Sequence, residues 1–168
     1  MGYLHDTGLS QFIPPTVFHF STGTITYTAG AVAGMIAAHR AAANQTTLIT
    51  IPCMIPSNSN ALKGGLIKSV EIDYKIEIAE PTTLIPTVLL VTRGVEGAVG
   101  VVAAQAFTQS PALAASQTVD EHKLVLTITT PFYILNTQYV LALLTMAAGA
   151  GGNTTDFYGA VVNYTLRV

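Results

Sequence analysis

Alternation of apolar and polar residues with a period of two marks several segments of the chain as strands. The clearest segment is 66–78, where apolar and charged side chains take alternate positions. The apolar set is Val70, Ile72, Tyr74, Ile76 and Ile78, and the charged set is Glu71, Asp73, Lys75 and Glu77. Because successive side chains of a strand point to opposite faces, the pattern predicts an antiparallel sheet with one buried and one solvated face.

Similar runs predict the remaining strands. They lie at 17–28, 46–55, 84–93, 98–107, 122–130, 139–147 and 157–168. In the last run, one face is predicted to carry Tyr158, Ala160, Val162, Tyr164, Leu166 and Val168. About eight strands separated by Gly and Pro turns favour a sandwich or barrel, and the fold class that we expect is an all-β antiparallel β-sandwich of jelly-roll type.

One segment lacks the strand pattern. Residues 29–43 are rich in Ala and contain no Pro, so they can form a short helix, although Gly30 and Gly34 weaken it. We therefore expect at most one short helix, near 30–43, or a loop of small residues in its place.

The N-terminal segment differs from the rest. Residues 1–16 are predicted to form an extended arm, and 17–168 a single β-sandwich domain. In the arm, consecutive prolines exclude a regular helix or a central strand. Such arms are ordered by a neighbour or not at all. The candidate partner contacts are Phe12, Ile13, Pro14 and Pro15.

The composition limits the classes of partner that we expect for the chain. The 168 residues are 50% hydrophobic and only 10% charged, which excludes disorder and favours uncharged surface in contact with other protein, as in a homo-oligomer. No apolar run is long enough for a membrane helix. The 7 Lys and Arg residues are dispersed, so nucleic acid is not an expected partner. Without a basic and apolar leader, the chain is expected to be made in the cytoplasm.

Catalytic and metal motifs are weak. Cys53 lies between apolar neighbours and is predicted to be a buried thiol. The four histidines, His5, His19, His39 and His122, lack metal-ligand spacing, and we expect His19 and His122 to bond backbone or hydroxyl groups. The carboxylates of 71–77 suit an exposed strand better than acid/base chemistry, and the Gly-rich 147–153 lacks the phosphate-binding Lys. We therefore predict no catalytic residue, no metal and no cofactor.

Sugar binding is an alternative for a β-sandwich. The chain has no Trp, and only Tyr3, Tyr133 and Tyr158 are offered as rings that could stack on a sugar.

Three stretches carry a resemblance to a known family. They are GGLIKSVEIDYKIEIAE, HKLVLTITTPFYILNTQYVLALLTM and DFYGAVVNYTLRV. In general type they resemble the jelly-roll cement or decoration proteins of tailed-bacteriophage capsids. The resemblance implies a non-enzymatic, often trimeric protein of the virion surface that clamps major capsid subunits. The alternative is a receptor- or glycan-binding module of a phage fibre or tail.

Overall fold

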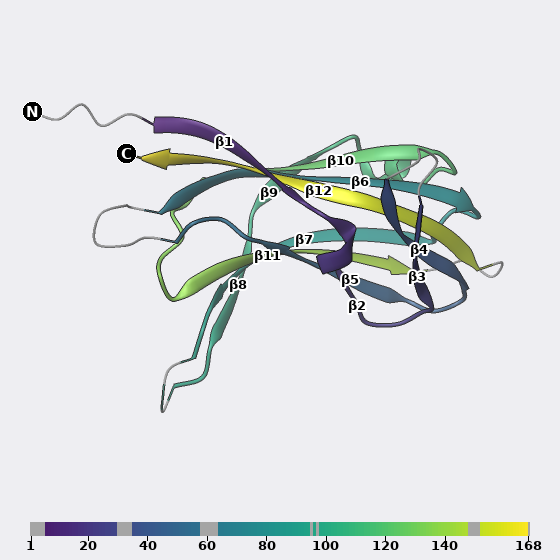
Figure 1. Ribbon diagram of the computed structural model, residues 1–168, viewed down its shortest axis with the longest axis horizontal. Coiled ribbons are helices and arrows are strands. Elements are labelled where there is room, and N and C mark those ends of the chain that lie inside the picture. The colour runs from purple at the N-terminus through teal and green to yellow at the C-terminus, as the bar shows by residue number, and fades with distance from the viewer. Residues whose placement is uncertain are drawn as a thin grey trace, which may run out of the picture.

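The chain folds into two antiparallel sheets that pack face to face (Figure 1). The computed structural model describes residues 6–29, 35–57, 64–94, 96, 98–147 and 152–167. The strands are β1 (Asp6–Ile13), β2 (His19–Phe20), β3 (Ile25–Ala29), β4 (Ile36–Ala43), β5 (Thr47–Cys53), β6 (Gly65–Ile78), β7 (Thr83–Thr92), β8 (Val101–Gln105), β9 (Phe107–Ser110), β10 (Glu121–Ile128), β11 (Gln138–Ala147) and β12 (Asn153–Arg167).

The order of the strands is that of a jelly roll. One sheet has seven strands in the order β3-β4-β12-β6-β10-β9, with β1 also paired to β12, and the other has five in the order β2-β5-β11-β7-β8. Among them, β4 pairs with β12, β5 with β11, β6 with β10, and β7 with β8. Such nested pairs arise when one long antiparallel hairpin is rolled into two sheets. The predicted all-β jelly-roll sandwich is confirmed.

The core confirms the register predicted for β6 over most of its length. Val70, Ile72, Tyr74 and Ile76 have no exposed surface and face the second sheet. Ile78, which the pattern groups with them, is 61% exposed where the strand ends. The burial pattern therefore holds while β6 is covered by the opposite sheet and fails beyond it.

The short helix or loop of small residues expected near 30–43 is not found in the part that the structure describes. Residues 36–43 form β4, which is paired with β3 on one side and β12 on the other, while 30–34 lie outside the described residues. Two sheet neighbours and the burial of Ala37 and Ala38 outweigh the helix propensity of Ala.

Helical structure in the described residues is limited to two short 3₁₀ turns, Pro15–Val17 and Leu113–Ser116. Neither these turns nor any other described helix has the length and apolar character needed to cross a membrane.

β12 has two partners along the same edge. Its first half, through Phe157, pairs with β4, and its second half, from Ala160, pairs with β1. The terminal strands therefore run side by side (Figure 1). The structure gives residues 6–13 a strand partner in their own chain, and their contact with another chain stays a prediction.

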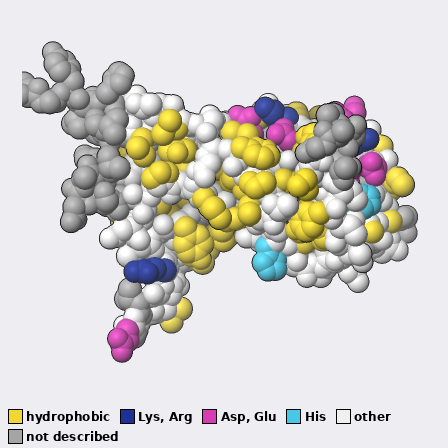
Figure 2. Space-filling model, in the orientation of Figure 1, with side chains coloured by type: hydrophobic (Ala, Val, Ile, Leu, Met, Phe, Trp, Pro, Cys, Tyr) yellow, Lys and Arg dark blue, Asp and Glu magenta, His cyan; other side chains and the backbone are white. Residues whose placement is uncertain are grey.

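Hydrophobic side chains also reach the surface. Figure 2 shows them gathered over the middle of one face, with charged side chains mainly toward its margins. Among the most exposed are Phe12, Ile36, Met54, Ile78, Val99, Val101 and Val102. The low charge of the chain therefore leaves apolar surface uncovered, as the composition predicts.

Candidate functional site

A hollow of about 450 Å³ lies on the outer face of the seven-stranded sheet, where β12 changes its partner from β4 to β1. Its lining residues are Phe12, Pro14, Pro15, Met35, Ile36, Asp73 and Tyr158. Most of these are apolar, and Asp73 and Tyr158 provide a carboxylate and a phenol. An apolar concavity with few polar groups has the composition of small-molecule sites.

A second hollow of about 290 Å³ adjoins the first and shares Asp73 and Tyr158 with it. Its lining residues are Asp73, Tyr74, Glu121, His122, Lys123 and Tyr158. The two hollows together, called here the outer groove, cross the strands β12, β6 and β10. The groove is apolar at the β1 end and charged at the β10 end.

A bulge in β12 turns Tyr158 toward the outer groove. The pairing of β12 with β6 shifts register between Phe157 and Gly159, and Gly159 has a φ of 141°, a conformation that L residues rarely adopt. Phe157 and Ala160 are consequently both buried, and Tyr158 lies half-buried on the other face. The prediction that Tyr158 shares a face with Ala160 is therefore wrong. Its ring lies at the groove, which is a suitable position for the stacking on a sugar that the sequence analysis considers.

The two shared residues have perturbed acidities. Burial raises the pKa of the Asp73 carboxyl, against the lowering effect of the Lys123 charge. Burial also raises the pKa of the Tyr158 phenol, and the charges of Asp156, Glu121 and Glu77 add to the rise. Both shifts have the same main cause, so a ligand in the groove meets partly desolvated polar groups.

A hydrogen-bonded chain holds the charged end of the groove. The Lys123 ammonium lies 2.7 Å from one Glu71 carboxylate oxygen, and the Asn163 amide donates to the other at 2.7 Å. Ser10 in turn donates to Asn163 at 2.6 Å. The Lys123 bond lowers the pKa of Glu71, with a smaller effect from Asn163. Four strands thus fix the position of Lys123 beside Asp73.

Two side chains have the environments that the sequence predicts for them. Nε2 of His122 lies 2.7 Å from the Thr118 carbonyl oxygen, which is the backbone partner expected for it. Cys53 is buried, and burial raises the pKa of its thiol to about 12. A thiol that remains protonated at neutral pH is a poor nucleophile.

The four arm residues differ in burial. Ile13 and Pro15 are buried in their own chain, and Phe12 and Pro14 are exposed. All of them except Ile13 line the first hollow. Their contact with a partner stays a prediction.

Four further sequence candidates lie away from the groove or outside the described residues. Tyr133 is half-buried beside Leu66, away from the residues that line the groove. Tyr3 and His5 lie outside the described residues, as does 148–151 of the Gly-rich loop.

Sequence patterns missed Met35 and Ile36 as part of the site, because the small residues of this segment indicate a helix or a loop. They also missed that Phe12 and Tyr158 meet at one hollow. The available signal was Gly159, since an isolated glycine inside a strand pattern often marks a bulge or a close approach.

Comparison with known proteins gives structural likeness only. No protein-family model and no curated protein matches the sequence. Three similar solved structures are carbohydrate-binding modules. TmCBM61, in complex with beta-1,4-galactotriose, is 7% identical, with 92% of this chain and 91% of that chain covered and a TM-score of 0.44.

The other two are family 11 modules from Clostridium thermocellum. One, in complex with a beta-1,3-1,4-mixed-linked tetrasaccharide, is 7% identical, with 96% of this chain and 89% of that chain covered and a TM-score of 0.39. The module of the cellulosomal cellulase Lic26A-Cel5E is 8% identical, with 96% and 88% covered and a TM-score of 0.40.

These findings correct the family suggested by the sequence. The resemblance to capsid cement or decoration proteins is wrong, and so is the capsid-stabilising role drawn from it, because the similar structures are carbohydrate-binding modules. The three stretches that carried the resemblance are strands of a jelly roll, and alternation within strands identifies a fold without identifying a family. The homo-oligomer and the location of the chain stay predictions.

Proposed function

We propose that this chain is a non-catalytic module that binds a carbohydrate chain along the outer groove. The observation that carries the proposal is the pair of adjoining hollows that share Tyr158 and Asp73. An elongated ligand that fills both would contact an apolar wall first and charged side chains further along. We do not assign the chain to a phage fibre or tail.

The groove offers both kinds of contact that a sugar ring needs. A pyranose has C–H groups that pack on aromatic rings and hydroxyl groups that form directed hydrogen bonds. Tyr158 and Phe12 supply the rings, and Asp73 supplies a carboxylate that accepts strong bonds from hydroxyls. Because Tyr158 is half-buried and lies on a strand, binding costs little ordering of its side chain.

Binding without cleavage agrees with the contacts of Glu71, the acid nearest to Lys123. A glycosidase needs one carboxylic acid that stays protonated and a second carboxylate at a set distance. Glu71 accepts bonds from Lys123 and Asn163, which lower its pKa and keep it ionised. Glu71 therefore serves to position Lys123 rather than to donate a proton.

Affinity electrophoresis and isothermal titration test the proposal. Beta-1,4-galactotriose and a beta-1,3-1,4-mixed-linked tetrasaccharide are the first probes, because they occupy modules of similar fold. A glycan array extends the search to other linkages. We expect at least one glycan to bind, with Tyr158→Ala weakening it at least about tenfold and Asp73→Asn weakening it less.

Tyr27→Ala is the matched control, because Tyr27 is an exposed tyrosine that lies on β3 and does not line either hollow. Its affinity is expected to equal that of the unmodified chain. Failure to bind any arrayed glycan, or equal binding by the Tyr158 and Tyr27 variants, would overturn the proposal. Thermal melts of each variant separate loss of the groove from loss of the fold.

A further inference from the structure

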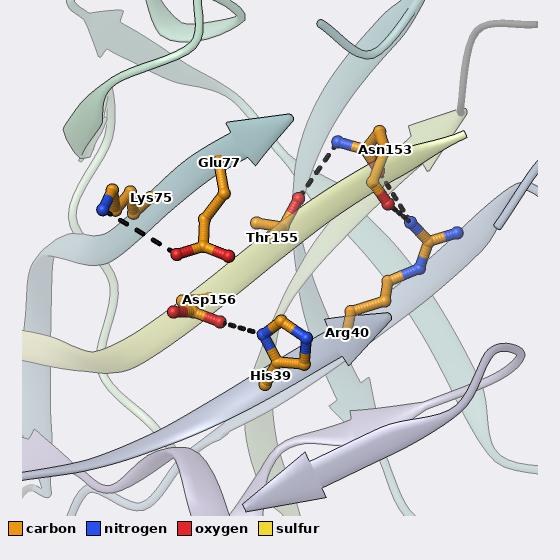
Figure 3. A network of polar contacts seen from close by, with 7 residues as sticks. All are labelled: His39, Arg40, Lys75, Glu77, Asn153, Thr155 and Asp156. Atoms are coloured by element: carbon orange, nitrogen blue, oxygen red, sulfur yellow. Dashed lines mark hydrogen bonds and ion pairs between the residues drawn. The ribbon is translucent and has the colours of Figure 1, made fainter. Parts of the chain in front are cut away.

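Three potential metal ligands converge beside the outer groove. They are His39 on β4, Asp156 on β12 and Glu77 on β6, and their ligand atoms all lie within 4.8 Å of one another. Figure 3 shows the two carboxylates and the imidazole on the same side of these three strands. None of the three lines either hollow, so the cluster is separate from the residues assigned to carbohydrate.

The sheet holds these side chains in fixed positions. His39 and Asp156 are direct cross-strand neighbours, and their Nδ1 and Oδ1 atoms are 2.6 Å apart. Glu77 is the extra residue of β6 where the register with β12 shifts, between the pairs Ile78–Thr154 and Ile76–Thr155. A bulge re-aims the side chain it carries, which brings a third ligand toward a pair that regular pairing already aligns.

The charge of the cluster favours a cation. Two carboxylates approach one imidazole, and in the described part of the chain the ammonium that pairs with the cluster is that of Lys75, 3.8 Å from Glu77. The side chains of His39, Asp156 and Glu77 are 28%, 15% and 34% exposed. An ion can therefore enter from solvent, and water can complete its coordination.

We propose that His39, Asp156 and Glu77 form a binding site for a divalent transition-metal ion of the Zn²⁺ type. One imidazole nitrogen and two carboxylate oxygens are ligands that Zn²⁺ accepts, with an open position left for water. The ion takes the place of the proton between His39 and Asp156, and Glu77 exchanges its contact with Lys75 for the metal. Ligand atoms of tetrahedral zinc lie roughly 3.3–3.5 Å apart, so small side-chain rotations close the cluster.

This site does not depend on the proposed carbohydrate function. The metal experiment uses metal alone as the ligand, without glycan, so either proposal can fail while the other stands.

Two titrations of the full chain test the proposal. Binding of Zn²⁺ is measured by calorimetry, and binding of Co²⁺ is measured by the visible absorption of the bound ion. We expect one ion per chain and d–d bands of a low-coordinate Co²⁺ ion that Zn²⁺ abolishes. His39→Ala, Glu77→Gln and Asp156→Asn are each expected to weaken binding at least about tenfold. Lys75→Met is expected to strengthen it, because this change removes a positive charge and leaves the ligands in place.

His19→Ala is the matched control, since His19 is an exposed histidine on β2 of the other sheet. The control is expected to bind Zn²⁺ as the unmodified chain does. Absence of stoichiometric binding by the folded chain, or equal binding by the His39 and His19 variants, would overturn the proposal and leave His39 and Asp156 as a hydrogen-bonded pair only. Circular dichroism confirms that each variant is folded, and the gain expected for Lys75→Met cannot come from a damaged fold.

Discussion

The ring of Phe12 occupies the space that a side chain at Gly159 would need. A Cβ atom built on Gly159 would lie 2.5 Å from Cε2 and 2.7 Å from Cζ of Phe12, and 3.0 Å from the carbonyl oxygen of Ile13. β1 can therefore cross close to β12 at the bulge, which is also where Tyr158 turns outward. One glycine thus shapes both the strand pairing and the apolar wall of the groove.

Gly159→Ala is expected to destabilise the fold by about 1–3 kcal/mol. The new methyl group meets the Phe12 ring, and the φ of 141° is unfavourable for alanine whatever space is available. Urea unfolding followed by circular dichroism measures the loss. The displaced ring should also change binding at the first hollow.

Gly8→Ala is the control for this change. Gly8 lies on β1, the strand that carries Phe12, but a Cβ there has no atom within 4 Å, and its φ is not in the positive range. Its expected effect on stability is within about 0.5 kcal/mol, in either direction. Equal stability of the two variants would show that the close contact of Phe12 with Gly159 contributes nothing.

The sequence predicts β6 well and β12 poorly for a physical reason. Along β6 the period of two runs without interruption from Val70 to Ile76, because the positions from Val70 to Lys75 each have one partner on either side. Along β12 the register with β6 shifts in three places. At the shift between Phe157 and Gly159 the extra residue, Tyr158, belongs to β12. This bulge inverts the faces of β12 that follow, so counting from Ala160 places Tyr158 on the wrong side. Hydrophobic alternation cannot reveal such a shift, because Tyr is compatible with either face.

The polar clusters could not be predicted from spacing. His39, Glu77 and Asp156 are far apart in sequence and meet only because β4, β12 and β6 are neighbours in the sheet. Arg40 likewise stands alone in the sequence but is fully buried. A single sequence indicates strands and faces, whereas the order of strands, which decides these contacts, comes from the tertiary fold.

Ile72→Asp is expected to unfold the domain, because it places an unpaired charge in the core between the two sheets. Ile78→Asp, on the same strand and in the same sequence pattern, is expected to cost less than about 1 kcal/mol, since Ile78 is 61% exposed. Circular dichroism and thermal melting distinguish the two. A comparable loss of stability in both variants would contradict the difference in burial along β6, where Ile76 is buried and Ile78 is exposed.

Arg40→Met is expected to destabilise the fold by about 2–4 kcal/mol. The guanidinium is buried and donates to the Thr47 hydroxyl at 2.8 Å, to the Asn153 side chain at 2.6 Å and to the Gln45 carbonyl at 2.8 Å. No ion pair of Arg40 is found among the described residues, and burial lowers its pKa. Methionine fills much of the volume but leaves these acceptors without a donor.

Arg93→Met serves as the control for the Arg40 change, because Arg93 is exposed. Arg40→Lys should fall between the two, since lysine keeps the charge but lacks the planar set of donors. Denaturant midpoints of the three variants measure the order. Equal midpoints for the Arg40 and Arg93 methionine variants would mean that the buried hydrogen bonds contribute no net stability.

Acid should weaken the contribution of Glu71 to stability. The Lys123 hydrogen bond lowers the pKa of Glu71 in the folded chain below its usual 4.5, so folding favours the ionised form. The contribution is therefore complete above pH 4.5 and is lost as pH falls through the folded-state value. A double-mutant cycle of Glu71→Gln and Lys123→Met, measured by urea unfolding at several pH values, isolates the pair. The coupling should be present at about pH 7 and decrease as the pH is lowered toward about 3, and an equal coupling at both would show that the Glu71 charge is not its source.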